Sequence, residues 1–500
     1  MSSYDVVIIG SGLGGLECGY ILSSEGYNVC IVEQHSQIGG CLQNFKRDNC
    51  VFDTGIHYIG GLDKGQILNQ YFTYFGLMDK LRLQRMDQEA FDVIGFANDP
   101  MEYHLAMGHE NFIRRLMEYF PDEKDALVHY IRKLNEICEH FPLYNLSYKN
   151  LHLNELQFFR ENAYDYFTSI TDNKKLQRVL AGTNSLYAGV PEKTPLYVHA
   201  LVNNSFIESS WKVVDGSSQI ADILAAKIIL NGGKIITSAR AEKFVFNNNR
   251  LTSVALANDE VIDARYFISA IHPAQTIGMV DEKFLRSVYR QRIKTLENTT
   301  SNFTLYIVFK PDSFEYLNHN LYFYRNENVW LSNEKADQNW PGNILLITPA
   351  SSSGSKYACN ATVMSYMNID DVKKWENTVV GKRSNDYLDF KQQKAGQMLD
   401  LVELRYPGFR KCIHKYYTSS PLTYRDYTGT VDGSLYGVLR DCNDPLKTLI
   451  SPRTKIPNLF LTGQNIILHG VLGVTIGSVT TCSELLGLEY LVGKIKSCNP

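Results

Sequence analysis

Three glycines near the N-terminus have the spacing of a turn that binds phosphate groups. Gly10, Gly12 and Gly15 fit the pattern G-x-G-x-x-G directly after the apolar run 6–9, and Glu33 ends the next apolar run. The first glycine permits a tight turn, the second leaves room for a pyrophosphate, and the third lets a helix pack against the strand. An acid such as Glu33 accepts a hydrogen bond from a ribose hydroxyl. These residues predict a dinucleotide site; a glycine-rich turn of another α/β fold and a solvated acid are the alternatives.

A second glycine-rich stretch lies near the C-terminus. Residues 458–477 read NLFLTGQNIILHGVLGVTIG, with a short apolar strand before the first glycine. A glycine-rich stretch so far along the chain indicates that the chain returns to close the same cofactor site. A site built from both ends of a chain favours a bound flavin over a nicotinamide that binds and leaves.

The spacing of apolar residues predicts the elements that must position these motifs. Residues 66–180 are mainly helical in pattern, and Asn247–Asn249 read as a hairpin turn. Helices are expected between Gly15 and Gly26, over 111–120, 122–140 and 155–169, between Gly216 and Gly232, and over 386–406. Strands are expected at 6–9, 28–32, 234–237, 251–256, 265–270, 301–310, 321–324, 343–348, 362–367 and 459–462.

Composition excludes several classes of function. The formal net charge is −3, so there is no electrostatic case for binding nucleic acid. No run approaches the ~18 consecutive apolar residues of a membrane span, and no basic segment of a signal peptide is evident. The ten cysteines form no C-x-x-C pair and the histidines no H-E-x-x-H motif. We therefore expect no metal and a cytoplasmic protein.

Aromatic residues are abundant, and two interpretations of them stay open. The chain has 31 Tyr and 24 Phe, many of them within 71–75 and 103–197. One interpretation is ordinary aromatic packing. The other is a tunnel, or a membrane-facing surface, for a large apolar ligand, because aromatic walls suit such pockets. In the second case the helical region would be the face that contacts a membrane.

Short motifs in order along nearly the whole chain carry a family resemblance. They are IIGSGLGGL, Glu33, Gly39–Gly40, FDTGIHYIGG, DGSSQIADIL with NGGKI, FISAIHP, YRDYTGT with GSLYG, and LTGQN with HGVLGVTIGS. The sequence resembles the phytoene desaturase, carotenoid isomerase and retinol saturase group of the flavin amine-oxidase-like superfamily. FDTGIHYIGG and the GGC and TGQ variants are most similar to the retinol saturase branch.

The resemblance implies FAD bound in an extended form. The AMP half would lie on the N-terminal turn, and the segment around Ala241 would meet the adenine. A helix beginning near Gly473–Val474 would point its positive end at the flavin. Two positions depart from the family, because Cys41 replaces a common Arg and Gln464 a common Asp or Glu. The residues expected to bind the cofactor are Gly10, Gly12, Leu13, Gly14, Gly15, Glu33, Gln34, Gly40, Cys41, Gly55, His57, Ala241, Gly463, Gln464, Gly473, Val474 and Thr475.

The resemblance also implies an α/β fold in which two domains interleave. A Rossmann-like FAD-binding domain would alternate with a substrate domain made of a mixed β-sheet and a helical lobe. The expected FAD-binding parts are 1–75, 206–290 and 426–500, the helical lobe is 76–205, and the part with the mixed sheet is 291–425.

Three residues are candidates for catalysis. Reduction of a C=C bond needs a hydride on one carbon and a proton on the other. The resemblance puts His57, Tyr58 and His469 near the flavin, and a structural hydrogen bond is the alternative for each histidine. The run Tyr424–Asp426 is polar, and a structural ion pair and turn is the alternative there.

Together these observations predict an FAD-dependent oxidoreductase that acts on carbon–carbon bonds of an apolar isoprenoid or polyene-like lipid. The reaction would be saturation, desaturation or isomerisation. The alternatives are an amine-oxidase-like flavoenzyme and a non-redox prenyl-lipid binder of the GDP-dissociation-inhibitor type. The sequence has one G-x-G-x-x-G motif, so NAD(P)H, if it is the reductant, would bind transiently at the flavin face; another electron carrier is the alternative. The expected state is a monomer or homodimer with peripheral membrane contact and no nucleic-acid partner.

Overall fold

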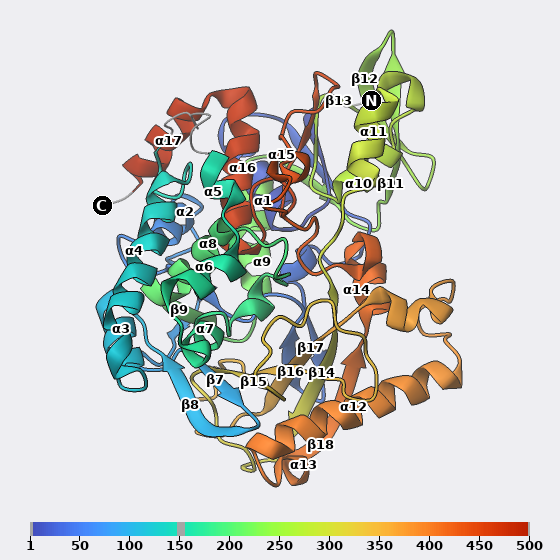
Figure 1. The fold of residues 1–500 in the computed structure, drawn as a ribbon. Coiled ribbons are helices and arrows are strands. Elements are labelled where there is room, and N and C mark those ends of the chain that lie inside the picture. Colours follow the sequence, from blue (N-terminus) through green and yellow to red (C-terminus); the bar gives the residue numbers. More distant parts are fainter. Residues whose placement is uncertain (1–3, 148–155, 499–500) are drawn as a thin grey trace.

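Strands from three distant parts of the chain form one parallel sheet (Figure 1). The computed structural model describes residues 4–147 and 156–498. The strand order is β10–β2–β1–β13, and β19 pairs with β13. The strands are β1 (Tyr4–Ile9), β2 (Val29–Val32), β10 (Lys234–Ile236), β13 (Val261–Ser269) and β19 (Leu459–Leu461). The predicted Rossmann-like sheet and its C-terminal strand are confirmed.

Helices from the two ends of the chain pack against each other on this sheet. Helix α1 (Leu13–Ser24) contacts both α9 (Ser218–Leu230) and α16 (Gly470–Leu486), and α17 (Leu488–Ser497) follows. Figure 1 draws the red α16 beside α1. The backbones approach closely, since a Cβ added to Gly14 would lie 2.9 Å from Gly463 Cα. The two glycine-rich stretches of the sequence are therefore in direct contact.

A β-hairpin extends the parallel sheet. Strands β11 (Ala241–Asn247) and β12 (Arg250–Leu256) are antiparallel, and β12 pairs with β13. Asn248 and Asn249 have φ values of 47° and 64°, the left-handed conformation that Asn tolerates in tight hairpins. The predicted turn at these asparagines is confirmed.

The second large sheet has seven strands in the order β18–β14–β17–β16–β15–β7–β8. Only β15 and β7 pair in parallel, so the sheet is mixed, as predicted. Strands β7, β8 and β18 were not predicted from the sequence, and β7 and β8 fall in the stretch predicted to be mainly helical. The bounds are β7 (Asp92–Phe96), β8 (Asp99–Leu105), β14 (Ser301–Phe309), β15 (Asn320–Tyr324), β16 (Asn343–Ile347), β17 (Asn360–Met367) and β18 (Ile413–Ser419).

A helical lobe lies beside this sheet. Its helices are α2 (Ile67–Tyr74), α3 (His109–Met117), α4 (Lys124–His140), α5 (Leu156–Arg160), α6 (Ala163–Ile170), α7 (Lys174–Leu180) and α8 (Leu196–Glu208). The single helix predicted over 155–169 is wrong: position 155 lies outside the described residues, and the rest forms two helices. The second begins where the Asn162 side chain accepts a hydrogen bond from Asp165 N.

Most aromatic residues of the lobe form its core. Tyr71, Phe72, Phe75 and Tyr130 are at most 1% exposed and belong to one apolar cluster. Packing therefore explains most of the aromatic bias. Three lobe aromatics, Phe141, Tyr144 and Phe206, line the cavity described below.

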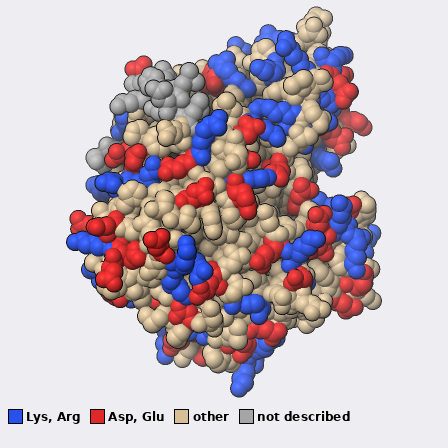
Figure 2. Space-filling model, viewed as in Figure 1, with Lys and Arg blue, Asp and Glu red and all other residues tan. Residues whose placement is uncertain are grey.

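Short elements complete the fold. The remaining helices are α10 (Pro273–Gly278), α11 (Ser287–Lys294), α12 (Asn385–Arg405), α13 (Phe409–Cys412), α14 (Pro421–Thr428) and α15 (Pro445–Thr448). The remaining strands are β3 (Asn44–Arg47), β4 (Cys50–Asp53), β5 (Ile59–Gly60), β6 (Leu83–Arg85) and β9 (Ser210–Val213). Figure 2 shows acidic and basic side chains interspersed over the visible face. Among the helices of residues 4–147 and 156–498, none is long and apolar enough to cross a membrane.

Candidate active site

A cavity of about 1340 Å³ runs between the parallel sheet, the mixed sheet and α8. Pockets for one small ligand usually have volumes of roughly 300–1,000 Å³. This cavity therefore has room for an extended cofactor and a second apolar molecule. Its lining comes from both glycine-rich ends of the chain and from most of the motifs between them, but not from DGSSQIADIL or NGGKI.

One end of the cavity is the turn between β1 and α1. Gly10 has a φ of 95°, which favours glycine, and a Cβ added to Gly15 would lie 2.0 Å from Gly10 O. Gly12 is different, because a Cβ there would meet nothing within 4 Å. Gly12 is also the N-cap of α1 and provides no side-chain cap, so the first N–H groups of the helix open onto the cavity. This is the geometry of an anion site at a helix N-terminus.

Glu33 lines the cavity next to this turn. Its Oε2 accepts hydrogen bonds from Ser11 N at 2.9 Å and Ser11 Oγ at 2.7 Å, and its Oε1 accepts one from His35 N at 2.9 Å. Each carboxylate oxygen can accept more than one hydrogen bond. Glu33 thus holds the glycine turn in shape and keeps acceptor capacity for a ligand hydroxyl.

The C-terminal stretch forms the facing wall. Helix α16 begins at Gly470, so the predicted start near Gly473–Val474 is three residues too late. Gly473 lies in the first turn, where a Cβ would be 2.6 Å from Leu468 O, so its small size serves packing. The N-cap His469 provides no side-chain cap. A second helix N-terminus with free N–H groups therefore opens onto the same cavity.

The structure brings nearly all the predicted cofactor residues together. Two do not line the cavity, namely Gly15, which packs under the turn, and Thr475, whose hydroxyl donates to Glu17 Oε1 at 2.7 Å. The residues that line it are Gly10, Gly12, Leu13, Gly14, Glu33, Gln34, Gly40, Cys41, Gly55, His57, Ala241, Gly463, Gln464, Gly473 and Val474. Which of them contacts a cofactor stays a prediction.

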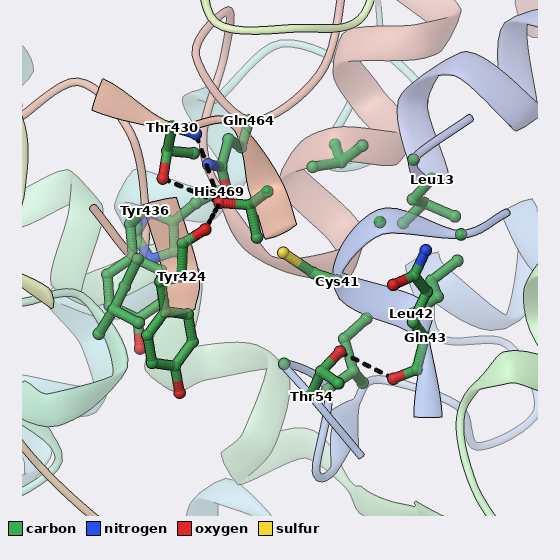
Figure 3. A pocket seen from close by; sticks show the side chains of 18 of the residues that line it. Leu13, Cys41, Leu42, Gln43, Thr54, Tyr424, Thr430, Tyr436, Gln464 and His469 are labelled. Carbon is green, nitrogen blue, oxygen red and sulfur yellow. Dashed lines mark hydrogen bonds between the residues drawn. The ribbon is translucent and has the colours of Figure 1, made fainter. Parts of the chain in front are cut away.

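Cys41 points into the cavity. Figure 3 shows its thiol between Leu13 on one side and Tyr424 and Tyr436 on the other. The side chain is accessible inside the cavity, and desolvation by the surrounding walls raises the pKa of the thiol, so it is neutral at physiological pH. A Cβ on Gly55 would lie 2.9 Å from Cys41 Cβ, so the glycine allows this close approach. The side chain at this position brings no charge to the phosphate end.

Of the three catalytic candidates, His57 has the ring that is free to react. It lines the cavity, and no described residue forms a hydrogen bond with its ring. Burial, with a smaller effect from the Lys212 charge, lowers the pKa of His57 to about 4. The imidazole is therefore neutral at physiological pH.

The hydroxyl of Tyr58 bonds to the mixed sheet. It donates to Asp92 Oδ2 at 3.0 Å and lies 2.7 Å from Tyr322 Oη. Asn320 Nδ2 donates to the other carboxylate oxygen of Asp92 at 2.9 Å. Burial raises the pKa of Asp92 to about 7. The Tyr58 ring forms cavity wall, stacked 4.3 Å from Phe206, while its hydroxyl serves a buried network.

His469 also has a structural hydrogen bond. Its Nε2 lies 3.0 Å from Leu186 O, so this nitrogen carries the proton. Its ring stacks on Tyr436 at 4.3 Å. Burial lowers the pKa of His469 to about 4, which leaves Nδ1 without a proton at neutral pH.

The polar run around Asp426 is a structural ion-pair site. Asp426 pairs with Arg425 at 3.0 Å and also with Arg383. Tyr424 Oη lies 2.9 Å from Thr304 Oγ1, and its ring lines the cavity beside Thr430 (Figure 3).

The sequence analysis offered a tunnel for an apolar ligand as one interpretation but did not identify the side chains that line the apolar arm of the cavity. Side chains of the helical lobe form one wall of this arm, and side chains of the mixed sheet form the other. The lobe side chains are Leu68, Phe141, Tyr144, Leu201, Val202 and Phe206, and those of the sheet are Tyr306, Leu345, Ile347, Met364 and Tyr366. Each lies in an ordinary apolar pattern, and no local signal separates a cavity wall from core packing.

The residues present fit a flavin dinucleotide. The open space at Gly12 and the free N–H groups of α1 suit a pyrophosphate, and Glu33 suits a ribose. The free N-terminus of α16 suits a ring that gains negative charge on reduction. The apolar arm continues from this second end.

Comparisons with known proteins agree with this site. Residues 8–75 match the family model described as an NAD(P)-binding Rossmann-like domain. The all-trans-retinol 13,14-reductase of Danio rerio is 25% identical over 96% of this chain and 86% of its own length. The prolycopene isomerase 1 of an Oncidium hybrid is 23% identical over 97% of this chain and 85% of its own. The solved structure of putrescine oxidase bound to putrescine has a TM-score of 0.63 at 13% identity, covering 97% of this chain and 99% of that one.

The fold and the site define a flavin-dependent oxidoreductase with the architecture of the flavin amine oxidases. Within this class, the chain is similar over nearly its whole length to the FAD-dependent family that contains the retinol saturases and the carotenoid desaturase-like enzymes.

Proposed function

We propose that the protein is an FAD-dependent oxidoreductase that acts on carbon–carbon bonds of an apolar, polyene-like lipid. The observation that carries this proposal is a single cavity with a polar part and an apolar part. The polar part contains two uncapped helix N-termini and Glu33, and the apolar part is the arm. Relatives that cover most of the chain act on retinol and prolycopene, by their names, which supports a polyene substrate.

FAD would supply the transfer of hydride to or from the substrate carbon. The two helix N-termini would bind and orient the cofactor, and the apolar walls would exclude water from the reacting bond. Gly10, Gly12, Leu13, Gly14 and Glu33 would hold the AMP half. The loop 463–474 would hold the flavin end.

His57 is the residue proposed to carry the proton, because the hydroxyl of Tyr58 and the Nε2 of His469 are engaged elsewhere. A neutral imidazole accepts a proton more readily than it donates one, and the pKa of His57 is about 4. The ligand-free site thus favours His57 as the base of a desaturation. A negative charge on the reduced cofactor would raise the pKa of His57, and His57 would then act as the acid in a saturation.

The cavity weighs against an amine substrate. Among the described residues, no Asp or Glu side chain lines the apolar arm, so none could pair there with a cationic amine. The substrate-binding part would comprise the helical lobe and the mixed sheet, whose side chains form the arm. NAD(P)H, if it is the reductant, would reach the flavin from solution, as one β1–α1 glycine turn lines the cavity.

The test begins with the colour of the purified protein. It should be yellow and should release FAD on denaturation; a colourless protein that FAD cannot reconstitute would refute the proposal. Anaerobic mixing then separates the reactions. Bleaching by NAD(P)H followed by reoxidation with a polyene indicates a saturase, whereas bleaching by the polyene itself indicates a desaturase. An amine that bleaches the flavin faster than any polyene would overturn the substrate class.

A further inference from the structure

A buried cation lies directly behind the loop that forms the flavin end of the cavity. Arg440 is 6% exposed. Its Nη2 donates to the carbonyl oxygens of Asn465, Ile466 and Ile467 at 3.0, 3.3 and 3.2 Å, and its Nη1 donates to Thr448 O. Asn465 and Ile467 line the cavity on the other side of the loop. One layer of backbone therefore separates the guanidinium from the cavity.

This cation has no anionic partner within the part of the chain that the structure describes. Among the described residues, every hydrogen bond of the Arg440 side chain goes to a carbonyl, and no Asp or Glu forms an ion pair with it. Arginine stays charged in proteins, and an unpaired buried charge is costly. Carbonyl oxygens solvate the guanidinium but do not cancel its charge. Its field consequently extends across the loop into the cavity.

The field of Arg440 adds to that of α16. The helix begins at Gly470, and its free N–H groups face the same region. Between them lies His469, which burial keeps neutral, so it brings no compensating charge. A low-dielectric cavity wall preserves such a field better than water does. The flavin end of the cavity is thus positive from two independent sources.

We propose that Arg440 is a positioning residue that stabilises negative charge on the reduced flavin and so makes the bound flavin easier to reduce. It acts through the loop and touches neither substrate nor cofactor. The proposal deepens the function proposed above and rests on the FAD site. It also gives a reason for a charged side chain at this position. Neutral donor groups could make hydrogen bonds to the four carbonyls without the cost of burying a charge.

The test compares two substitutions of Arg440 in the FAD-bound protein. Arg440→Gln removes the charge and keeps amide donors, whereas Arg440→Lys keeps the charge and loses the planar fork. The readout is the ratio of reduced to oxidised flavin at a fixed solution potential, measured by equilibration with a redox dye. Arg453→Gln, which removes a charge from a side chain 65% exposed, is the matched control.

We expect Arg440→Gln to lower this ratio about tenfold, equivalent to about 30 mV for a two-electron couple. Arg440→Lys and Arg453→Gln should change it less than about twofold, because both keep the buried charge. An unchanged ratio in Arg440→Gln, or equal losses in Gln and Lys variants, would overturn the proposal and leave Arg440 as a loop anchor. A protein that binds no FAD at all refutes the proposed function instead.

A measurement on the unaltered protein covers the case in which both variants fail to fold. If Arg440 and α16 balance the charge of the reduced flavin, reduction by two electrons should take up one proton. The midpoint potential should then fall by about 30 mV per pH unit between pH 7 and 9. Twice that slope means that a second proton, on the flavin or on His57 or His469, balances the charge, and this outcome would also overturn the proposal.

Discussion

Replacing Gly12 or Gly15 by alanine should affect two different properties, cofactor binding at Gly12 and the stability of the fold at Gly15. At Gly12 the backbone has φ −64° and ψ 175°, which any residue adopts, and a Cβ would meet nothing within 4 Å. At Gly15 a Cβ would lie 2.0 Å from Gly10 O and 3.3 Å from Ala270 Cβ. The first methyl group enters the cavity, whereas the second enters the backbone of the turn.

Gly12→Ala should therefore fold normally and lose the cofactor. Alanine restricts the unfolded chain but is a poorer N-cap, so the free energy of unfolding should change by less than about 1 kcal/mol. A methyl group facing the pyrophosphate should weaken FAD binding at least tenfold, or about 1.4 kcal/mol. Fluorescence titration of the FAD-free protein and urea unfolding measure the two quantities.

Gly15→Ala should instead destabilise the fold itself. Forcing extra volume into a packed site costs about 1–3 kcal/mol, and a clash with backbone belongs at the upper end because backbone cannot change rotamer. The FAD-free protein should show this loss, which separates it from a loss of ligand stabilisation. Normal FAD affinity in Gly12→Ala, or equal unfolding energies for the two variants, would contradict the roles assigned to this turn.

Three further outcomes follow from individual ionisable side chains. His57→Gln should lower turnover about 10²–10⁴-fold, whereas Tyr58→Phe should lower it less than about tenfold and cost ~1 kcal/mol of stability, as steady-state rates and urea unfolding will show. Burial raises the pKa of Glu17 to about 8, so the folded protein holds a proton that the unfolded chain loses above about pH 4.5. Stability should then fall between these pH values by up to ~1.4 kcal/mol per pH unit, and Glu17→Gln should flatten this slope in unfolding titrations. A hydrogen bond with the Cys50 thiol lowers the pKa of the exposed Cys359 to about 7, so Cys359 should be the first thiol alkylated by iodoacetamide at pH 7, as mass mapping can check.

The sequence predicted most strands because their signals are local. The apolar run of β1 and the alternation of β14 follow from side chains that neighbours in the chain already specify. Strand β18 was missed because it is an edge strand. None of its first six residues is buried, four being partly buried and two exposed, so little alternation remains. Strand β7 was missed because five buried residues in a row fit a helix as well as a strand.

The cofactor end of the site could also be predicted from sequence. A turn that admits a pyrophosphate must have glycines at fixed spacing. These glycines, such as Gly10 and Gly12, lie close together in the sequence, so the pattern can be recognised locally. The predicted start of α16 near Gly473 is late because the sequence alone does not separate the helix start at Gly470 from Gly473. A side chain at Gly473 is excluded by the close contact with Leu468.

Local sequence patterns were enough to predict the glycine turn, the acid that follows it, and the family resemblance. Which groups face the cavity depended instead on contacts between distant segments. The tertiary structure joined Gly14 to Gly463, turned the hydroxyl of Tyr58 toward Asp92, and placed the charge of Arg440 behind the flavin loop. These pairs lie far apart in the chain, so no periodicity records them. They exist because tertiary packing brings distant segments into contact, and most buried polar groups find their hydrogen-bond partners across those contacts.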